Sequence, residues 1–275
     1  MINNNTLPLK IIYACLVGIL ALTLPVLIIE KLGIQIDEPL HKHLIQSCFT
    51  GLIAVTGIWF LITKMDKQLP ISIGLIQPKK AIAQFLFGFG LIALPLLITI
   101  LLSIMFGWGD VSFNISTAVL PGIIFGLIST FFTDALTEEL IFRGYIYSNL
   151  KARFNTWLSA LITLLLFVSL PVIISAIQKV FGIDWAVPIT VGYIITLVFF
   201  GSFVQYLRIL TKSIWGGVGF HLFFVQMNQF MGITDDSLIE FSETSNQQPI
   251  QATLIVLLLL VFTGLIVYPI IKKRK

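Results

Sequence analysis

The sequence predicts an all-α polytopic membrane protein with about eight transmembrane helices. Of its 275 residues, 57% are hydrophobic and 11% are charged, whereas soluble domains carry about 25% charged residues. The apolar residues gather in runs of about 20, the length that an α-helix needs to cross the hydrocarbon core of a bilayer. Composition and run length together exclude a soluble globular domain.

Eight apolar segments meet this length criterion. They are residues 11–29, 44–63, 81–106, 118–142, 157–177, 186–207, 214–231 and 253–271. The first is followed by Glu-Lys-Leu-Gly without a small-residue cleavage site, so we expect a retained helix and not a removed signal peptide. We treat residues 1–275 as a single integral membrane domain.

Glycine and proline in several of these spans are interpreted as packing features. Gly88, Gly90 and Pro95 in the third span allow close helix contact or a kink, as is common in membrane helices. Pro171 in the fifth span removes a backbone donor and is expected to kink that helix. The sixth span contains no ionisable group before Arg208 and is also interpreted as a packing helix.

The basic residues predict the orientation. With both termini in the cytoplasm, 14 of the 17 lysines and arginines fall on cytoplasmic segments, and Lys31, Lys42 and Lys179 are the exceptions. This asymmetry follows the positive-inside rule. We therefore expect an integral protein of a bacterial plasma membrane, with lipid around it. Nucleic acid is rejected as a partner, because the basic residues lie at loop ends and form no basic stripe with interleaved aromatics.

The most informative motif is TDALTEELIFRGYIYSNL, which starts at Thr133 in the fourth span. An ionised side chain at membrane depth costs about 2.5–3.5 kcal/mol, so three acids here need a reason. On a helix, Glu139 and Arg143 are four residues apart and form a favourable ion pair. Asp134 and Glu138 lie on the neighbouring stripe. Glu138 is thus buried beside a like charge without an obvious partner, a setting that suits a general base or acid.

A structural alternative explains the same motif. The charges would mark a helix end at the cytoplasmic interface, where Arg143 snorkels and the acids are solvated. Gly144 would loosen or end the helix at this point.

The seventh span holds a second polar group within SIWGGVGFHLFFVQMNQF. His221 is the only histidine in the predicted spans, and Asn228 lies seven residues further, on the same helix face. His221 is either a hydrogen-bonded interior residue or a site residue that meets the carboxylate motif. The residues alone leave both readings open.

Glu138-Glu139-Leu-Ile-Phe-Arg143 matches the EExxxR motif of the CPBP family, the CAAX-protease and bacteriocin-processing (Abi) intramembrane proteases. IGLIQPKKAIAQFLFGFGL and KSIWGGVGFH also resemble stretches of that family, so the resemblance covers about residues 73–228. It implies an all-helical fold with a cavity open to the cytoplasm. In such proteins Glu138 would activate water for peptide-bond hydrolysis, Glu139 and Arg143 would support it, and His221 would be the late histidine.

The chain departs from the family pattern at two positions. The FxxxH motif corresponds to Phe167-Val-Ser-Leu-Pro171, and the HxxxN or HxxxD motif places Val225 four residues after His221. If a divalent metal such as zinc is bound, Glu138 and His221 would hold it. A catalytic zinc site normally takes three protein ligands, so Glu138, Glu139 and one histidine would need Asp134 to join them. Asn228, two turns beyond His221, would replace the polar residue missing at Val225.

Three functions remain as hypotheses. The first is an intramembrane metalloprotease-like endopeptidase that hydrolyses a membrane-associated protein or peptide. The second is a catalytically impaired relative, a pseudoprotease that serves as a binding scaffold in envelope regulation or bacteriocin immunity. The third is a transporter, which intramembrane carboxylates also permit, although the chain shows no repeated pair of broken helices.

Overall fold

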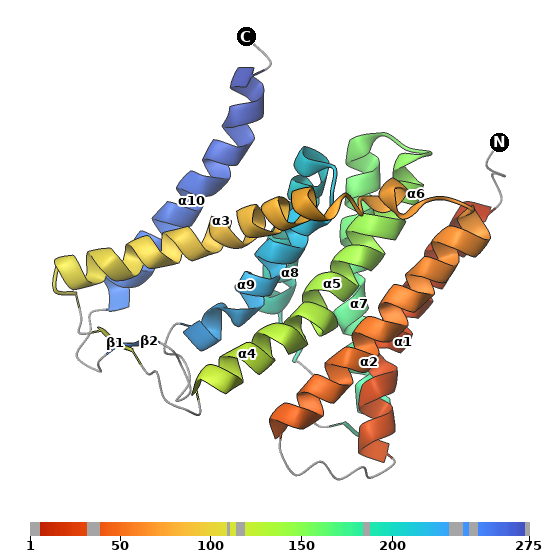
Figure 1. The fold of residues 1–275 in the computed structure, drawn as a ribbon, viewed down its shortest axis with the longest axis horizontal. Coiled ribbons are helices and arrows are strands. Elements are labelled where there is room, and N and C mark those ends of the chain that lie inside the picture. Colours follow the sequence, from red (N-terminus) through yellow and green to blue (C-terminus); the bar gives the residue numbers. More distant parts are fainter. Residues whose placement is uncertain are drawn as a thin grey trace.

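The structure, a computed structural model, describes residues 6–31, 39–108, 111–113, 119–183, 188–230, 239–241 and 247–272. Within these residues the protein is a bundle of helices with one small pair of strands (Figure 1). The helices are α1 (Leu7–Lys31), α2 (Pro39–Phe60), α3 (Pro78–Met105), α4 (Val119–Thr130), α5 (Leu136–Glu138), α6 (Tyr147–Lys151), α7 (Thr156–Val180), α8 (Val191–Thr211), α9 (Trp215–Phe230) and α10 (Gln247–Lys272). Strands β1 (Val111–Phe113) and β2 (Ile239–Phe241) pair antiparallel.

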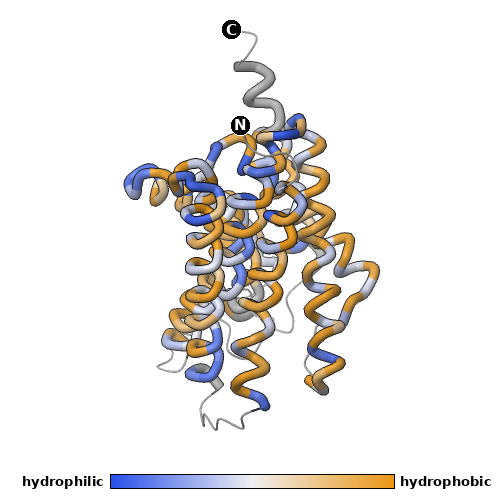
Figure 2. Tube along the Cα trace, turned by 90° about the vertical axis from the view of Figure 1, so that its right-hand side faces the viewer, coloured by the Kyte–Doolittle hydropathy of each residue, from blue (hydrophilic) through white to orange (hydrophobic). Residues whose placement is uncertain are grey.

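The all-α membrane fold is confirmed, and each of the eight predicted segments is helical. Among the described residues, six helices are long and apolar enough to cross a membrane. The helix α9 has only 16 residues, and the fully described apolar stretch of α10, Ile250–Leu265, is also shorter than 18 residues. The count of eight spans therefore stays a prediction. Figure 2 shows that hydrophobic residues dominate the length of the bundle and that hydrophilic residues gather toward its ends.

The bundle has two ends, which we name from the course of α1. The proximal end is where α1 begins at Leu7, and α10 also ends there, at Lys272. The distal end is where α1 ends at Lys31 and α2 begins at Pro39. In the view of Figure 1 the proximal end is at the top and the distal end at the bottom.

The fourth apolar segment is longer than the sequence predicts. It is one continuous helix from Val119 to Lys151, in which α4, α5 and α6 are joined by π-helical turns at Phe131–Ala135 and Glu139–Ile146. The predicted end at residue 142 is therefore wrong. Gly144 lies inside the second wide turn and does not end the helix. Wide turns of this kind are frequent at functional sites because they redirect side chains.

Glycines bring α3 and α9 into backbone contact. A Cβ atom on Gly88 would lie 1.9 Å from the carbonyl oxygen of Gly216, and one on Gly219 would lie 2.0 Å from that of Phe85. Neither position tolerates a side chain while the helices keep this distance. The expectation that Gly88 permits close packing is confirmed, and the contact holds α9, with its histidine, against the bundle.

Candidate active site

Glu139 and Arg143 form a buried ion pair in the second π-helical turn. Nη1 of Arg143 lies 3.1 Å from Oε1 of Glu139, and their side chains are 1% and 0% exposed. The predicted i,i+4 pair is confirmed. The alternative of a solvated helix end is wrong, because water does not reach either group and Glu138 lies near the middle of the helix Val119–Lys151.

Arg143 is fixed by three further groups. Its Nη2 donates to the carbonyl oxygen of Gly201 at 3.1 Å, and its guanidinium lies 4.1 Å from the ring centroid of Phe167. Glycine at position 201 lets the backbone of α8 lie close to α7, because a Cβ atom there would lie 2.7 Å from Leu164. The backbone carbonyl of Arg143 accepts a hydrogen bond from Nε of Arg208 at 2.9 Å. An arginine held by a fork of donors and a ring cannot move without breaking all of these contacts.

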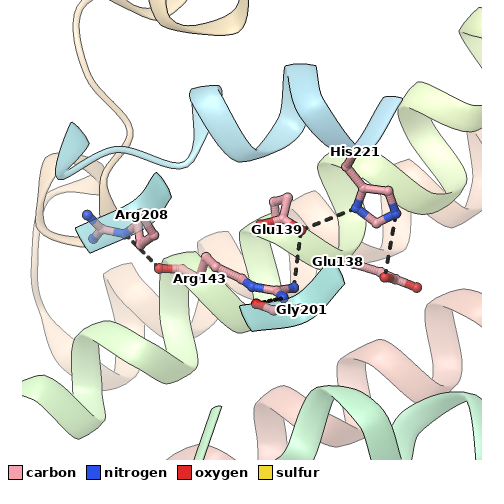
Figure 3. Close-up of polar contacts among 6 residues, drawn as sticks. All are labelled: Glu138, Glu139, Arg143, Gly201, Arg208 and His221. Atoms are coloured by element: carbon pink, nitrogen blue, oxygen red, sulfur yellow. Dashed lines mark hydrogen bonds and ion pairs between the residues drawn. The ribbon is translucent and has the colours of Figure 1, made fainter. Parts of the chain in front are cut away.

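His221 of α9 joins the two glutamates (Figure 3). Its Nδ1 lies 3.2 Å from Oε1 of Glu139, and its Nε2 lies 3.9 Å from Oε2 of Glu138. Because Glu139 is paired with Arg143 it is a carboxylate and an acceptor, so Nδ1 carries the hydrogen of this bond. The ring of Phe200 packs edge-on against the imidazole, and the two ring centroids are 4.6 Å apart. His221 thus meets the carboxylate motif, as the second of the two readings expects.

Glu138 points away from this buried layer and into a cavity of about 440 Å³. Its side chain is 15% exposed, and Asp134, one turn earlier, lines the same cavity. The two acids therefore share one wall, as their spacing predicts. Gln226 also lines it and donates its amide to the carbonyl of Gly126 at 3.1 Å and to the hydroxyl of Thr130.

The cavity lies on the distal side of Glu138. It reaches His43, near the beginning of α2, and Gln178, near the end of α7. The two expectations of cytoplasmic termini and a cytoplasm-facing cavity are therefore incompatible, because the ends of α1 and α10 that bear the termini lie at the opposite end of the bundle. The expected direction of the cavity rests on the family resemblance, whereas the expected side of the termini rests on the distribution of basic residues.

The two departures from the family pattern occupy different surroundings. Pro171 lines the same cavity as Glu138, so an apolar side chain stands where the family pattern has a histidine. Val225 is 40% exposed on the outer surface of α9. Asn228 belongs to α9, but its side chain lies outside the described residues. The idea that it replaces Val225 stays a prediction.

The described residues do not provide a complete set of ligands for a catalytic metal. Among them no group of three His, Cys, Asp or Glu side chains lies close enough to hold an ion. Glu138 and His221 remain the two residues nearest to such a role, but catalytic zinc takes three protein ligands. The arrangement of these described residues therefore does not fit a catalytic zinc centre.

Sequence reasoning missed the glycines and the second arginine that shape the site. A Cβ atom on Gly217 would lie 2.9 Å from Oε2 of Glu139 and 2.8 Å from Val204, so only glycine leaves room for the carboxylate. Arg208 was treated as a topology signal, yet it is buried. A glycine one turn before a predicted site histidine is a signal that could have pointed to Gly217.

Residues 119–227 match the family model described as type II CAAX prenyl endopeptidase Rce1-like. The matched segment contains the glutamate pair, Arg143 and His221. Over this segment the chain is similar to the CAAX-protease family. Neither the curated proteins nor the solved structures compared with the chain gave a match. The family supports a CAAX-type intramembrane protease at the coarse level and leaves the roles of individual residues to be argued from their geometry.

Proposed function

We propose that this protein is an intramembrane endopeptidase of the CAAX-protease type that uses Glu138 as its general base. The observation that carries the proposal is the imidazole of His221, which lies between a buried carboxylate and a carboxylate that faces a cavity. A purely structural histidine would be satisfied by Glu139 alone. Here the second ring nitrogen is directed toward Glu138, where a substrate could enter.

The chemistry follows from the order of the three groups. Arg143 pairs with Glu139, Glu139 accepts the Nδ1 hydrogen of His221, and the ring is thereby held with Nε2 toward Glu138. The separation of 3.9 Å between Nε2 and Oε2 of Glu138 leaves room for one water molecule. When the imidazole carries a proton on both nitrogens, this water donates a hydrogen bond to Glu138 and accepts one from Nε2. This places a nucleophilic water next to a base at the cavity wall.

The proposed reaction is hydrolysis of a peptide bond. Glu138 takes a proton from the water, and the water oxygen bonds to the peptide carbonyl carbon. A protonated Nε2 of His221 can donate a hydrogen bond to the oxyanion that develops. The C–N bond then breaks, Glu138 returns its proton to the leaving nitrogen, and the products are one carboxylate and one amine. Substrates are proposed to be membrane-associated proteins or peptides.

The test compares peptide termini in membrane and secreted fractions. Cells carry the native protein, no protein, Glu138→Gln, or Glu30→Gln, all at equal abundance. Glu30 is a matched control because it is a carboxylate near the end of α1 that pairs with Lys42 and lies outside the site. We expect one set of termini to vanish both without the protein and with Glu138→Gln, and to persist with Glu30→Gln. Termini that persist with Glu138→Gln would refute the proposed base.

A second candidate is a catalytically impaired family member that binds its partner in the same cavity. It is favoured by Pro171, which gives an apolar wall where the family pattern has a histidine, and by Val225 on the outer surface. Such a scaffold would act in envelope regulation or bacteriocin immunity. In that case a growth or envelope phenotype would require the protein but would be unchanged by Glu138→Gln.

A further inference from the structure

The walls of the cavity come from the distal parts of six helices. Val26 belongs to the last third of α1, Gln46 to the first half of α2, and Gly122 to the first turn of α4. Gln178, Tyr193 and Gln226 belong to the end of α7, the start of α8 and the last third of α9. Each named position lies toward the end of its helix that is at the distal end of the bundle, as the helix directions in Figure 1 show.

The proximal side of Glu138 is closed by packed side chains. All eight residues of Glu139–Ile146 are buried, and none of them lines the cavity. Behind them Arg208 donates from Nη2 to the hydroxyl of Ser148 at 3.2 Å, in addition to its bond with the backbone of Arg143. A substrate that came from the proximal end would have to displace this hydrogen-bonded layer.

The basic residues assign each end to one side of the membrane. The basic residues at and beside the proximal connections between helices include Lys64, Lys67, Lys151, Arg153 and Lys212. The distal helix ends hold Lys31, Lys42 and Lys179. By the positive-inside rule the proximal end faces the cytoplasm. The distal end, and with it the cavity, then faces the extracytoplasmic side.

We infer that the site takes its substrate from the extracytoplasmic side of the membrane. This inference rests on the proposed function. The substrate class is a polypeptide stretch exposed on that side, either a loop or juxtamembrane segment of a membrane protein or a membrane-bound peptide. Both products, the new carboxylate and the new amine, are released to the same side.

The cavity has the size and chemistry for such a stretch. Its volume of about 440 Å³ lies within the range of about 300–1,000 Å³ typical of ligand sites, so it holds a short extended segment and not a folded domain. Hydroxyl and amide side chains make up much of the wall, and they can pair with the backbone groups of an unfolded peptide. These neutral polar residues are Gln46, Thr50, Ser129, Thr133, Ser175 and Gln178.

Thiol labelling tests the side of the opening directly. In a background that lacks Cys15 and Cys48, Ser129→Cys places a near-isosteric thiol on the cavity wall, and Lys151→Cys places one on the exposed proximal surface. A membrane-impermeant maleimide is applied to right-side-out and to inside-out vesicles. We expect Ser129→Cys to react at least ten times faster in right-side-out vesicles, and Lys151→Cys to show the reverse preference.

Two results would overturn the inference. One is labelling of Ser129→Cys from the same face as Lys151→Cys, and the other is labelling from neither face. Since a variant can misfold, equal abundance and equal resistance to protease are required of both, and His43→Cys on the same wall provides a second probe. Labelling does not depend on catalysis. A chain that labels as expected but cleaves nothing would refute the proposed peptidase and leave the assigned side intact.

Discussion

Removing Arg143 should destabilise the whole bundle, because it leaves Glu139 as a buried charge. In Arg143→Met the carboxylate of Glu139, which is 0% exposed, loses its ion pair at 3.1 Å and keeps one hydrogen bond, from His221. Breaking a buried pair costs about 3–5 kcal/mol, and an unpaired charge at the centre of a membrane helix costs about 2.5–3.5 kcal/mol. Both values indicate that the free energy of unfolding falls by about 3 kcal/mol. This corresponds to roughly a hundredfold change in the unfolding equilibrium constant.

The double variant Glu139→Gln/Arg143→Met separates the charge from the packing. It removes both charges while keeping side chains of similar length, so much of the loss should be recovered. The free energy of unfolding is measured by denaturant titration in detergent micelles for the native protein, both single variants and the double variant. If Arg143→Met changes this free energy by less than about 1 kcal/mol, or if the two single effects simply add, Glu139 is not held as a buried anion.

Two further substitutions test the surroundings of the glutamates. Gly217→Ala should lower the melting temperature and any cleavage activity, because its Cβ would lie 2.9 Å from the carboxylate of Glu139; overpacking of this kind costs about 1–3 kcal/mol. Gly264→Ala is the matched control, because a Cβ atom there would meet nothing within 4 Å, and it should not lower the melting temperature. Pro171→His should add a third donor to the cavity wall beside Glu138 and produce zinc retention, measured as metal content after dialysis; unchanged metal content would contradict this placement.

The sequence predicted those parts of the site that depend on local spacing. Glu139 and Arg143 are four residues apart, and this distance alone brings them together on a helix. The position of His221 relative to them depends on the packing of α9, and only the family resemblance indicated it. Even so, the stronger contact of His221 is with Glu139 and not with Glu138.

Contacts made by backbone groups and glycines were beyond the reach of sequence patterns. The carbonyl of Gly201 accepts from Arg143 across 58 residues, and Arg208 donates to the carbonyl of Arg143 across 65 residues. A carbonyl has the same chemistry in every residue, so no residue type identifies the one that will be used. A glycine in an apolar helix likewise suits many kinds of packing, and the sequence does not state which neighbour it admits.

The largest error concerns depth in the membrane, and its cause is physical. A boundary drawn from apolar runs stops within the charged motif, so the fourth span is predicted to end at residue 142, four residues after Glu138. Glu139 and Arg143 are buried and paired with each other, and the helix continues to Lys151, 13 residues beyond Glu138. At 1.5 Å per residue this distance is up to about 20 Å, compared with about 6 Å in the prediction. Charges that neutralise one another inside a protein no longer mark the membrane surface, and for this reason the motif that defines the site also concealed its depth.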